Sequence, residues 1–301
     1  MNHGNVAARS RLADKLATVA FWGGAAVVIL ILATLVGYIL YTGGRHISWQ
    51  FLTAPPETVR AGGGIGPQLF NSFYLLLLSM LMTLPVGLLA GIYLAEYARP
   101  GFLTEAIRLS IETLTSLPSI VVGLFGLLAF VVLTGWGYSL TAGALALTVI
   151  NLPLIVRVSE EAVRNVPTDL REGSLALGAT RWQTIWRVVI PCAFPALLTG
   201  FIIAAGRVFG EAAALLYTAG MASPYINFSL WNPAHPTSPL NPFRPAETLA
   251  VHVWKVNSEA LIPDMRRVGD GAAAVLVLLV LVFNLAARWL GQWAHRRMTA
   301  A

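Results

Sequence analysis

Residues 199–220 read TGFIIAAGRVFGEAAALLYTAG, an apolar stretch that is interrupted by two charged side chains, Arg207 and Glu211. A run of this length and hydropathy is typical of a membrane-spanning helix, which needs about 20 mostly apolar residues. Charges are costly at membrane depth, so each of the two must have a partner or a purpose. The stretch therefore predicts a membrane protein with a functional position in this span.

The composition of the whole chain agrees with a membrane protein. Of its 301 residues, 56% are hydrophobic and only 11% are charged, whereas a soluble domain carries about 25% charged residues. The single cysteine, Cys192, excludes an intramolecular disulfide and disfavours a thiolate metal site. The five histidines are scattered without ligand spacing, so the sequence predicts no metal site.

Charge-free intervals predict six transmembrane helices and an all-α fold. The interval between Glu112 and Arg157 is long enough for two helices joined by a turn at TGWGY, residues 134–138. The fifth helix is expected to continue past Glu211 towards Ala219, and the sixth to include Val268. The remaining charge-free intervals are 16–44, 61–95, 188–206 and 271–287.

Lys and Arg residues predict the orientation of these helices. With both termini in the cytoplasm, the inner segments hold thirteen of these residues and the outer segments six, while Arg207 lies within a span. Topology therefore explains the net charge of +6, and no nucleic-acid partner is expected. Two outer segments are long, residues 43–67 and 221–265, and residues 246–256 predict a short amphipathic helix at the membrane interface.

The longest inner connection, residues 157–187, predicts two short helices that meet at a glycine. Leu170, Ser174 and Leu177 share a face of the first helix. Gly178 ends that helix, because a C-terminal glycine accepts a left-handed conformation. The apolar stripe of the second helix is formed by Trp182, Ile185 and Val189.

This connection resembles the signature loop of ABC importer permeases, which reads Glu-Ala-Ala, three residues, Gly, nine residues, Ile-x-Leu-Pro. Small residues replace the Ala pair, Val188 and Ile190 replace Ile and Leu, and the spacing is intact. The resemblance implies a coupling helix that sits in a groove of a separate ATP-binding subunit. The residues assigned to ATPase coupling are Glu172, Gly173, Ser174, Gly178, Arg181 and Pro191.

The chain lacks the Gly-Lys pair that a P-loop needs, since neither lysine follows a glycine. We therefore expect no cofactor in this chain, with ATP and Mg²⁺ bound by a partner, and no catalysis of covalent chemistry.

Four segments together resemble the PstA-type permeases of bacterial phosphate importers: GIYLAEY (91–97), LPSIVVGLF (117–125), SLALGATRWQTI (174–185) and GRVFGEAAALLYTA (206–219). The resemblance implies a type I ABC importer permease with a MetI-like core in the bacterial inner membrane. That core would span 68–287, between flanking regions 1–67 and 288–301, with the coupling loop at 160–191. The implied partners are a PstC-type permease, two PstB-type ATPases, a PstS-type binding protein and inorganic phosphate.

Arg207 and Glu211 lie four residues apart, which would place them on one helix face. They could neutralise each other, pair with another helix, or serve an anionic substrate, for which the planar fork of Arg is well suited. The resemblance favours a role in phosphate passage, although Ala212 stands where Thr is common in the family.

Three polar residues are weaker candidates for the substrate pathway. Ser116 and Ser119 flank Pro118, a predicted kink, and could donate to an anion, but such hydroxyls more often bond their own helix. Asn151 is more typical of helix packing than of ligand binding.

Other function classes are compatible with parts of the sequence. The same machinery could carry sulfate or molybdate. An ATP-independent transporter could use Glu211 as a proton carrier, but it would have no reason to keep the segment 172–191. A membrane scaffold would have no need of charges at residues 207 and 211.

Overall fold

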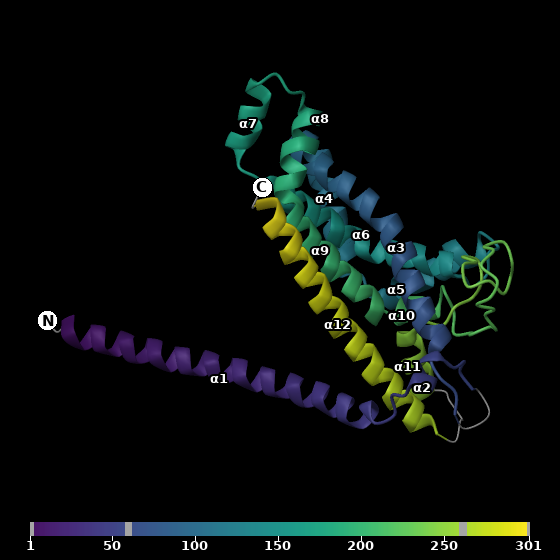
Figure 1. The fold of residues 1–301 in the computed structure, drawn as a ribbon. Helices are drawn as coiled ribbons and strands as arrows, with labels where there is room; N and C mark the ends of the chain where they lie inside the picture. Colours follow the sequence, from purple (N-terminus) through teal and green to yellow (C-terminus); the bar gives the residue numbers. More distant parts are fainter. Residues whose placement is uncertain (1–2, 58–61, 259–263, 300–301) are drawn as a thin grey trace.

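The computed structural model describes residues 3–57, 62–258 and 264–299, and side chains from residue 14 to residue 292 within these ranges. All regular elements in the described ranges are helices, as the sequence predicts (Figure 1). Arg60, which the topology assigns to an outer segment, lies outside the described residues, as do residues 259–263.

Five helical segments are long and apolar enough to cross a membrane. The second combines α3 with the π-helical turn η1, and the fourth runs through α8, the π-helical turn η3 and α9. The elements of these segments are α1 (His3–Gly44), α3 (Gly66–Ile92), η1 (Tyr93–Tyr97), α6 (Leu140–Arg164), α8 (Arg181–Thr184), η3 (Ile185–Val189), α9 (Ile190–Gly210) and α12 (Met265–Thr299).

The third predicted span is a bent pair of helices rather than one helix. Its two halves, α4 (Phe102–Ser116) and α5 (Ser119–Gly126) with the π-helical turn η2 (Leu127–Val132), meet at 100°. Pro118 explains the break, because it cannot donate a helical hydrogen bond and it forces the preceding residue to be extended. The described residues contain six candidate membrane spans only if this bent pair of helices is counted as a single span.

The fifth span is also interrupted, which corrects the expectation of a helix that continues to Ala219. α9 ends at Gly210, Glu211 is extended, and a short helix α10 (Ala213–Leu216) follows. Backbone without helical bonds is tolerated at membrane depth only where protein or a water-filled cavity surrounds it. Here α10 packs against α5, since a Cβ on Gly123 would lie 2.8 Å from the Ala214 Cα.

The core of the molecule lies between α3, α6 and α9. Leu75, Leu147 and Val208 come from these three helices and belong to one buried cluster. The helices approach closely because small residues face their neighbours, as at Gly91, where a Cβ would lie 2.4 Å from the Ser159 Cβ. This packing fixes the helices that carry the candidate residues.

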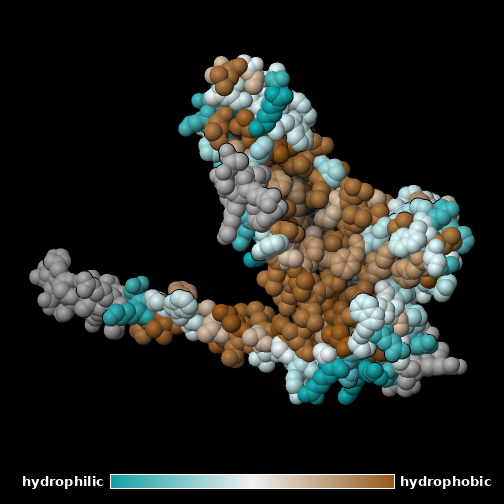
Figure 2. All heavy atoms as spheres, viewed as in Figure 1, coloured by the Kyte–Doolittle hydropathy of each residue, from teal (hydrophilic) through white to brown (hydrophobic). Residues whose placement is uncertain are grey.

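The two ends of the helix bundle carry polar elements. At one end, α7 (Thr168–Ala176) and α8 form a projection, which we call the knob, and α12 ends beside it (Figure 1). At the other end, which we call the loop end, residues 221–258 lie with α2 (Trp49–Thr53) and α11 (Leu249–Ser258). Figure 2 shows an apolar surface between the two ends.

α11 differs from the helix expected at the membrane interface. Leu249, Val251 and Val256 are buried, so α11 is packed into the loop end instead of lying on its surface. Val256 contributes to a buried cluster with Phe51 of α2 and Val268 of α12. The start of α12 at Met265 confirms that the sixth span includes Val268.

α1 stands apart from the bundle. It approaches α12 at its C-terminal end, where a Cβ on Gly43 would overlap the Asp270 carbonyl, and it then extends away from the other helices (Figure 1). No residue in its most apolar window is buried. This chain alone therefore does not cover the apolar surface of α1.

Candidate functional site

The knob has the turn that the sequence predicts. α7 begins after Pro167 and ends at Ala176, and Gly178 has a left-handed φ of +85°. Thr180 and Gln183 then form a capping box that starts α8. Because each helix end has its own local signal, the two-helix knob follows from the sequence of this segment.

The knob exposes most of its predicted coupling residues. Glu172, Gly173, Gly178 and Arg181 are exposed on the knob, and Pro191 is exposed at the start of α9. The Ser174 hydroxyl lies 2.9 Å from the Thr184 hydroxyl and joins α7 to α8.

Apolar side chains are exposed on the knob as well. At its tip, Leu177 is 91% exposed, and Trp182 is exposed although the sequence placed it in an apolar stripe with Ile185 and Val189, which are buried. These apolar side chains are therefore accessible at the tip of the knob.

Arg207 and Glu211 do not share a helix face, which corrects the prediction from their spacing. α9 ends between them at Gly210, and no ion pair within 4.0 Å joins them. The Glu211 Oε1 instead accepts a hydrogen bond of 3.2 Å from the Ala214 amide, at the start of α10. Arg207 is exposed in the last turn of α9, where a cation interacts favourably with the helix dipole.

The weaker pathway candidates occupy three different environments. The exposed Ser116 donates to the Thr113 carbonyl at 2.7 Å, so its hydroxyl bonds its own helix as expected. Ser119 is half-buried at the start of α5. Asn151 is buried in α6, and its Oδ1 has no hydrogen-bond partner in the described part of the chain. No hydrogen bond between described residues joins these three side chains to Arg207 or Glu211.

The tertiary structure brings the two interrupted spans together. Val122 of α5, Ile150 of α6 and Ala214 of α10 form one buried cluster, and Leu117 at the bend packs against it. Each break leaves backbone groups without helical partners. The candidate pathway residues Ser119 and Glu211 therefore lie beside breaks that share one cluster.

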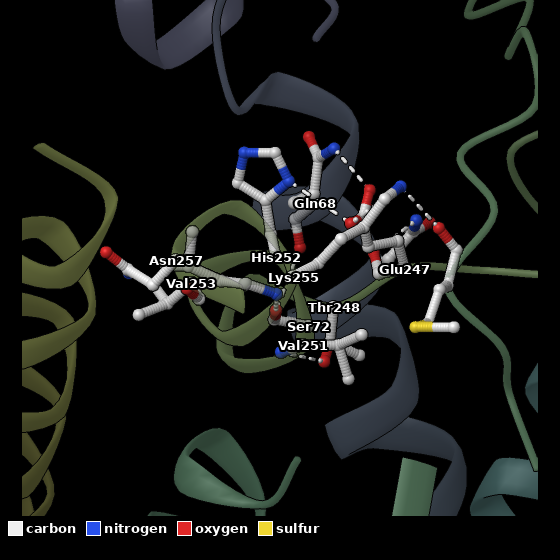
Figure 3. A network of polar contacts seen from close by, with 12 residues as sticks. Gln68, Ser72, Glu247, Thr248, Val251, His252, Val253, Lys255 and Asn257 are labelled. Carbon is white, nitrogen blue, oxygen red and sulfur yellow. Dashed lines mark hydrogen bonds and ion pairs between the residues drawn. The ribbon is translucent and has the colours of Figure 1, made fainter. Parts of the chain in front are cut away.

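A buried polar network at the loop end was not predicted from the sequence (Figure 3). Glu247 is 1% exposed; its Oε2 accepts from the Gln68 Nε2 at 3.0 Å, and its Oε1 lies 3.2 Å from the His252 Nδ1 and 3.4 Å from the Lys255 Nζ. The spacing of His252 and Lys255 indicates a shared helix face. Gln68 is 179 residues distant from Glu247, and no local signal joins them.

A second set of contacts extends this network. The Asn71 side chain donates to the Glu247 carbonyl at 3.0 Å and accepts from the buried Arg244 at 2.7 Å. The Lys255 Nζ donates to the Met221 carbonyl at 2.8 Å. The long segment 221–258 is therefore fixed to α3 by buried hydrogen bonds, which are costly to leave unmade.

The surroundings of the network shift the pKa values of two of its members. Burial raises the pKa of Glu247, but the contacts with His252, Gln68 and Lys255 outweigh burial and leave this pKa below its ordinary value. Burial lowers the pKa of Arg244 to about 10. Both groups are therefore charged at neutral pH.

A charged cleft of about 210 Å³ lies between α4 and α6 near the knob. Glu160, whose side chain is 13% exposed, pairs with Arg108 at 2.9 Å and Arg164 at 3.0 Å. The packing of α4 against α6 brings Arg108 to Glu160. The described residues contain no group of His, Cys, Asp or Glu that could hold a metal ion.

The protein-family comparison matches residues 87–300 to "Binding-protein-dependent transport system inner membrane component". A probable ABC transporter permease protein of Bacillus subtilis, YqgI, is 57% identical over 96% of this chain and 99% of that protein. The phosphate transport system permease protein PstA of Yersinia pestis is 34% identical over 79% of this chain and 75% of that protein.

A solved structure shares the fold. The crystal structure of a bacterial alginate ABC transporter contains a chain that aligns with a TM-score of 0.65 and 15% identity, over 93% of this chain and 94% of that one. The likeness at this identity concerns the arrangement of helices and says nothing of the cargo.

Proposed function

Because the chain belongs to the family of inner membrane components of binding-protein-dependent transport systems, the permeases of ABC importers, we propose that its cargo is inorganic phosphate. The observation that carries the proposal is the 34% identity to a phosphate transport system permease, which extends over 79% of the chain. The exposed guanidinium of Arg207 agrees with it, since Arg suits the planar recognition of phosphate oxygens.

In this proposal, Arg207 offsets part of the cost of desolvating the anion at membrane depth. Glu211 and Ser119 lie beside the breaks in the helices and complete the pathway together with Asn151 of α6, while the hydroxyl of Ser116 is already bonded to its own helix. The permease core covers 68–287, and a homologous PstC-type permease supplies the other half of the pathway. A PstS-type binding protein delivers phosphate at the loop end.

The knob is proposed as the coupling element. Two PstB-type subunits bind ATP and Mg²⁺, and their closure moves the knobs of the two permeases. Glu172, Gly173, Ser174, Gly178, Arg181 and Pro191 form or support the surface that meets the ATP-binding subunit. The exposed Leu177 at the tip adds apolar area to this surface.

The orientation follows from the charge bias. With the knob and both termini in the cytoplasm of a bacterium, thirteen Lys and Arg residues lie inside and six outside. The C-terminal end of α12 lies beside the knob in Figure 1, which fits this placement.

Uptake by the reconstituted complex tests the proposal. The chain is purified with its partner permease and ATP-binding subunits, placed in liposomes with the binding protein, and supplied with labelled phosphate, sulfate or molybdate. We expect ATP-dependent uptake of phosphate above the other two ions. Uptake of sulfate or molybdate in place of phosphate would contradict the proposed cargo, and uptake without ATP would contradict the proposed mechanism.

A further inference from the structure

α7 of the knob is weakly attached to the rest of the chain. None of its residues is buried. Among the described residues, its polar side-chain contacts with other elements are the Ser174–Thr184 hydroxyl contact and the contacts of Arg171. A movement applied to α7 can reach α8 and η3 by packing, and it reaches the ends of α3 and α6 through Arg171.

Arg171 contacts the ends of two different spans. Its Nε lies 3.1 Å from the Glu96 Oε1, in η1 at the end of α3. One of its terminal nitrogens donates to the Val163 carbonyl, in the last turn of α6. The Nε–H is not aligned with the carboxylate oxygen, so the contact with Glu96 is an ion pair rather than a directed hydrogen bond.

Both contacts of Arg171 are of types that stabilise the C-terminal ends of helices. The last four carbonyls of a helix lack partners within it, and a cation at this end interacts favourably with the helix dipole. The side chains of Arg171 and Glu96 are each 19% exposed, so solvent screens their attraction less than that of a surface pair. α3 and α6 are themselves tightly packed around Gly91, and a displacement of either end will be shared by both.

We infer that Arg171 is a positioning residue that transmits movement of the knob to α3 and α6 through Glu96 and the Val163 carbonyl. The inference rests on the proposed coupling function and adds a specific route to it. Arg171 and Glu172 are adjacent in the sequence but differ in exposure. Glu172 is exposed, whereas Arg171 is half-buried and contacts Glu96 and the Val163 carbonyl.

Coupling between ATP hydrolysis and uptake provides the test. Arg171→Gln and Glu96→Gln are each introduced into the complete complex in liposomes, and uptake and ATP hydrolysis are measured in the same vesicles, with labelled phosphate or whichever ion the wild-type complex carries. We expect both variants to assemble and hydrolyse ATP, while the ions moved per ATP fall at least about fivefold, the lower end of common coupling effects. Arg187→Gln is the matched control, since Arg187 is exposed near the knob and has no ion pair in the described chain.

Two further variants separate transmission from folding. The double variant Arg171→Gln/Glu96→Gln is expected to lose no more coupling than Arg171→Gln alone, because the two residues act through one contact. The exchanged pair Arg171→Glu/Glu96→Arg is expected to recover part of the coupling. If the Arg171→Gln complex fails to assemble, the test rests on the Glu96→Gln complex, in which Arg171 keeps its contact with the Val163 carbonyl.

If an assembled Glu96→Gln complex moves as many ions per ATP as the wild-type complex, the inference is overturned and the proposed function stays intact. A wild-type chain that never associates with an ATP-binding subunit would overturn the proposed function itself.

Discussion

Arg207 is an exposed charged residue in the last turn of α9, and it has no ion pair within 4.0 Å among the described residues. The break after Gly210 separates it from Glu211, which is engaged with the start of α10. A guanidinium in this state remains available to an anion, which supports the role proposed for Arg207.

Arg207→Gln is expected to lower phosphate uptake by at least about tenfold without loss of assembly, since a hydrogen bond to a charged group contributes about 1.5–3 kcal/mol. Arg207→Lys, which keeps the charge but lacks the planar fork, is expected to fall between wild type and Arg207→Gln. Uptake of labelled phosphate at saturating ATP measures the effect of each of the two substitutions. An Arg207→Gln complex with wild-type uptake would exclude the anion role.

Glu247 is the residue on which the loop-end network depends, and its lowered pKa sets a pH dependence. A carboxyl whose pKa is lowered by folding stabilises the folded state above its unfolded pKa, about 4.3, and this stabilisation is lost as pH falls through the folded pKa. Glu247→Gln leaves His252 and Lys255 without their carboxylate, at a cost of about 3 kcal/mol at neutral pH.

Thermal unfolding of the detergent-purified protein, measured from pH 7 downward through the folded-state pKa of Glu247, tests this effect. We expect the wild type to be more stable than Glu247→Gln at pH 7 and the difference to shrink as the pH falls through that pKa, where the Glu247 side chain becomes neutral. A stability difference that does not change with pH would show that Glu247 acts through its shape alone.

At the scale of elements, the knob depends on the left-handed residue between its two helices. Gly178 has φ +85° and no atom within 4 Å of its Cβ position, so the backbone alone limits substitution there. A β-branched residue in this region is strained by about 1–2 kcal/mol, and it favours a different turn.

Gly178→Val is therefore expected to uncouple ATP hydrolysis from uptake, with loss of phosphate-stimulated hydrolysis in the assembled complex. Gly101→Val is the control, because Gly101 also has open space around it but has an extended backbone that valine can adopt. Normal phosphate-stimulated hydrolysis in the Gly178→Val complex would argue against a rigid knob.

At the scale of the whole molecule, α1 is the element that this chain leaves uncovered. Its apolar side chains are exposed over the length of a membrane span, and it contacts the bundle mainly where Gly43 meets Asp270. In the proposed complex, lipid covers part of this surface and the homologous permease covers the rest, since tight helix association in membranes depends on packing between partners.

A photo-crosslinking residue at Val28, which is exposed on α1, is expected to capture the partner permease in membranes that contain the complete complex. The same group at the buried Leu147 is expected to crosslink only within the chain. Mass analysis of the adducts distinguishes the outcomes, and adducts of Val28 with lipid alone would contradict a protein neighbour for this part of α1.

The sequence alone determined the membrane class, the places of six charge-free spans, the bend at Pro118 and the turn at Gly178. Each of these depends on local chemistry: the lack of charges over a span, the missing amide of proline, and the freedom of glycine at positive φ. The resemblance in the coupling loop identified the family, which the comparisons confirm, and the roles of its individual residues stay predictions.

The tertiary structure decided what depends on distant contacts. The end of α9 at Gly210 accompanies the packing of α10 on α5, and the glycine alone does not mark it, since Gly200 and Gly206 lie within the same helix. Glu247 contacts Gln68, and Glu160 contacts Arg108, only because the packing of distant segments brings these side chains together. Periodicity and spacing describe one helix at a time, so they could not place the buried network, the contacts of Arg171 or the separation of Arg207 from Glu211.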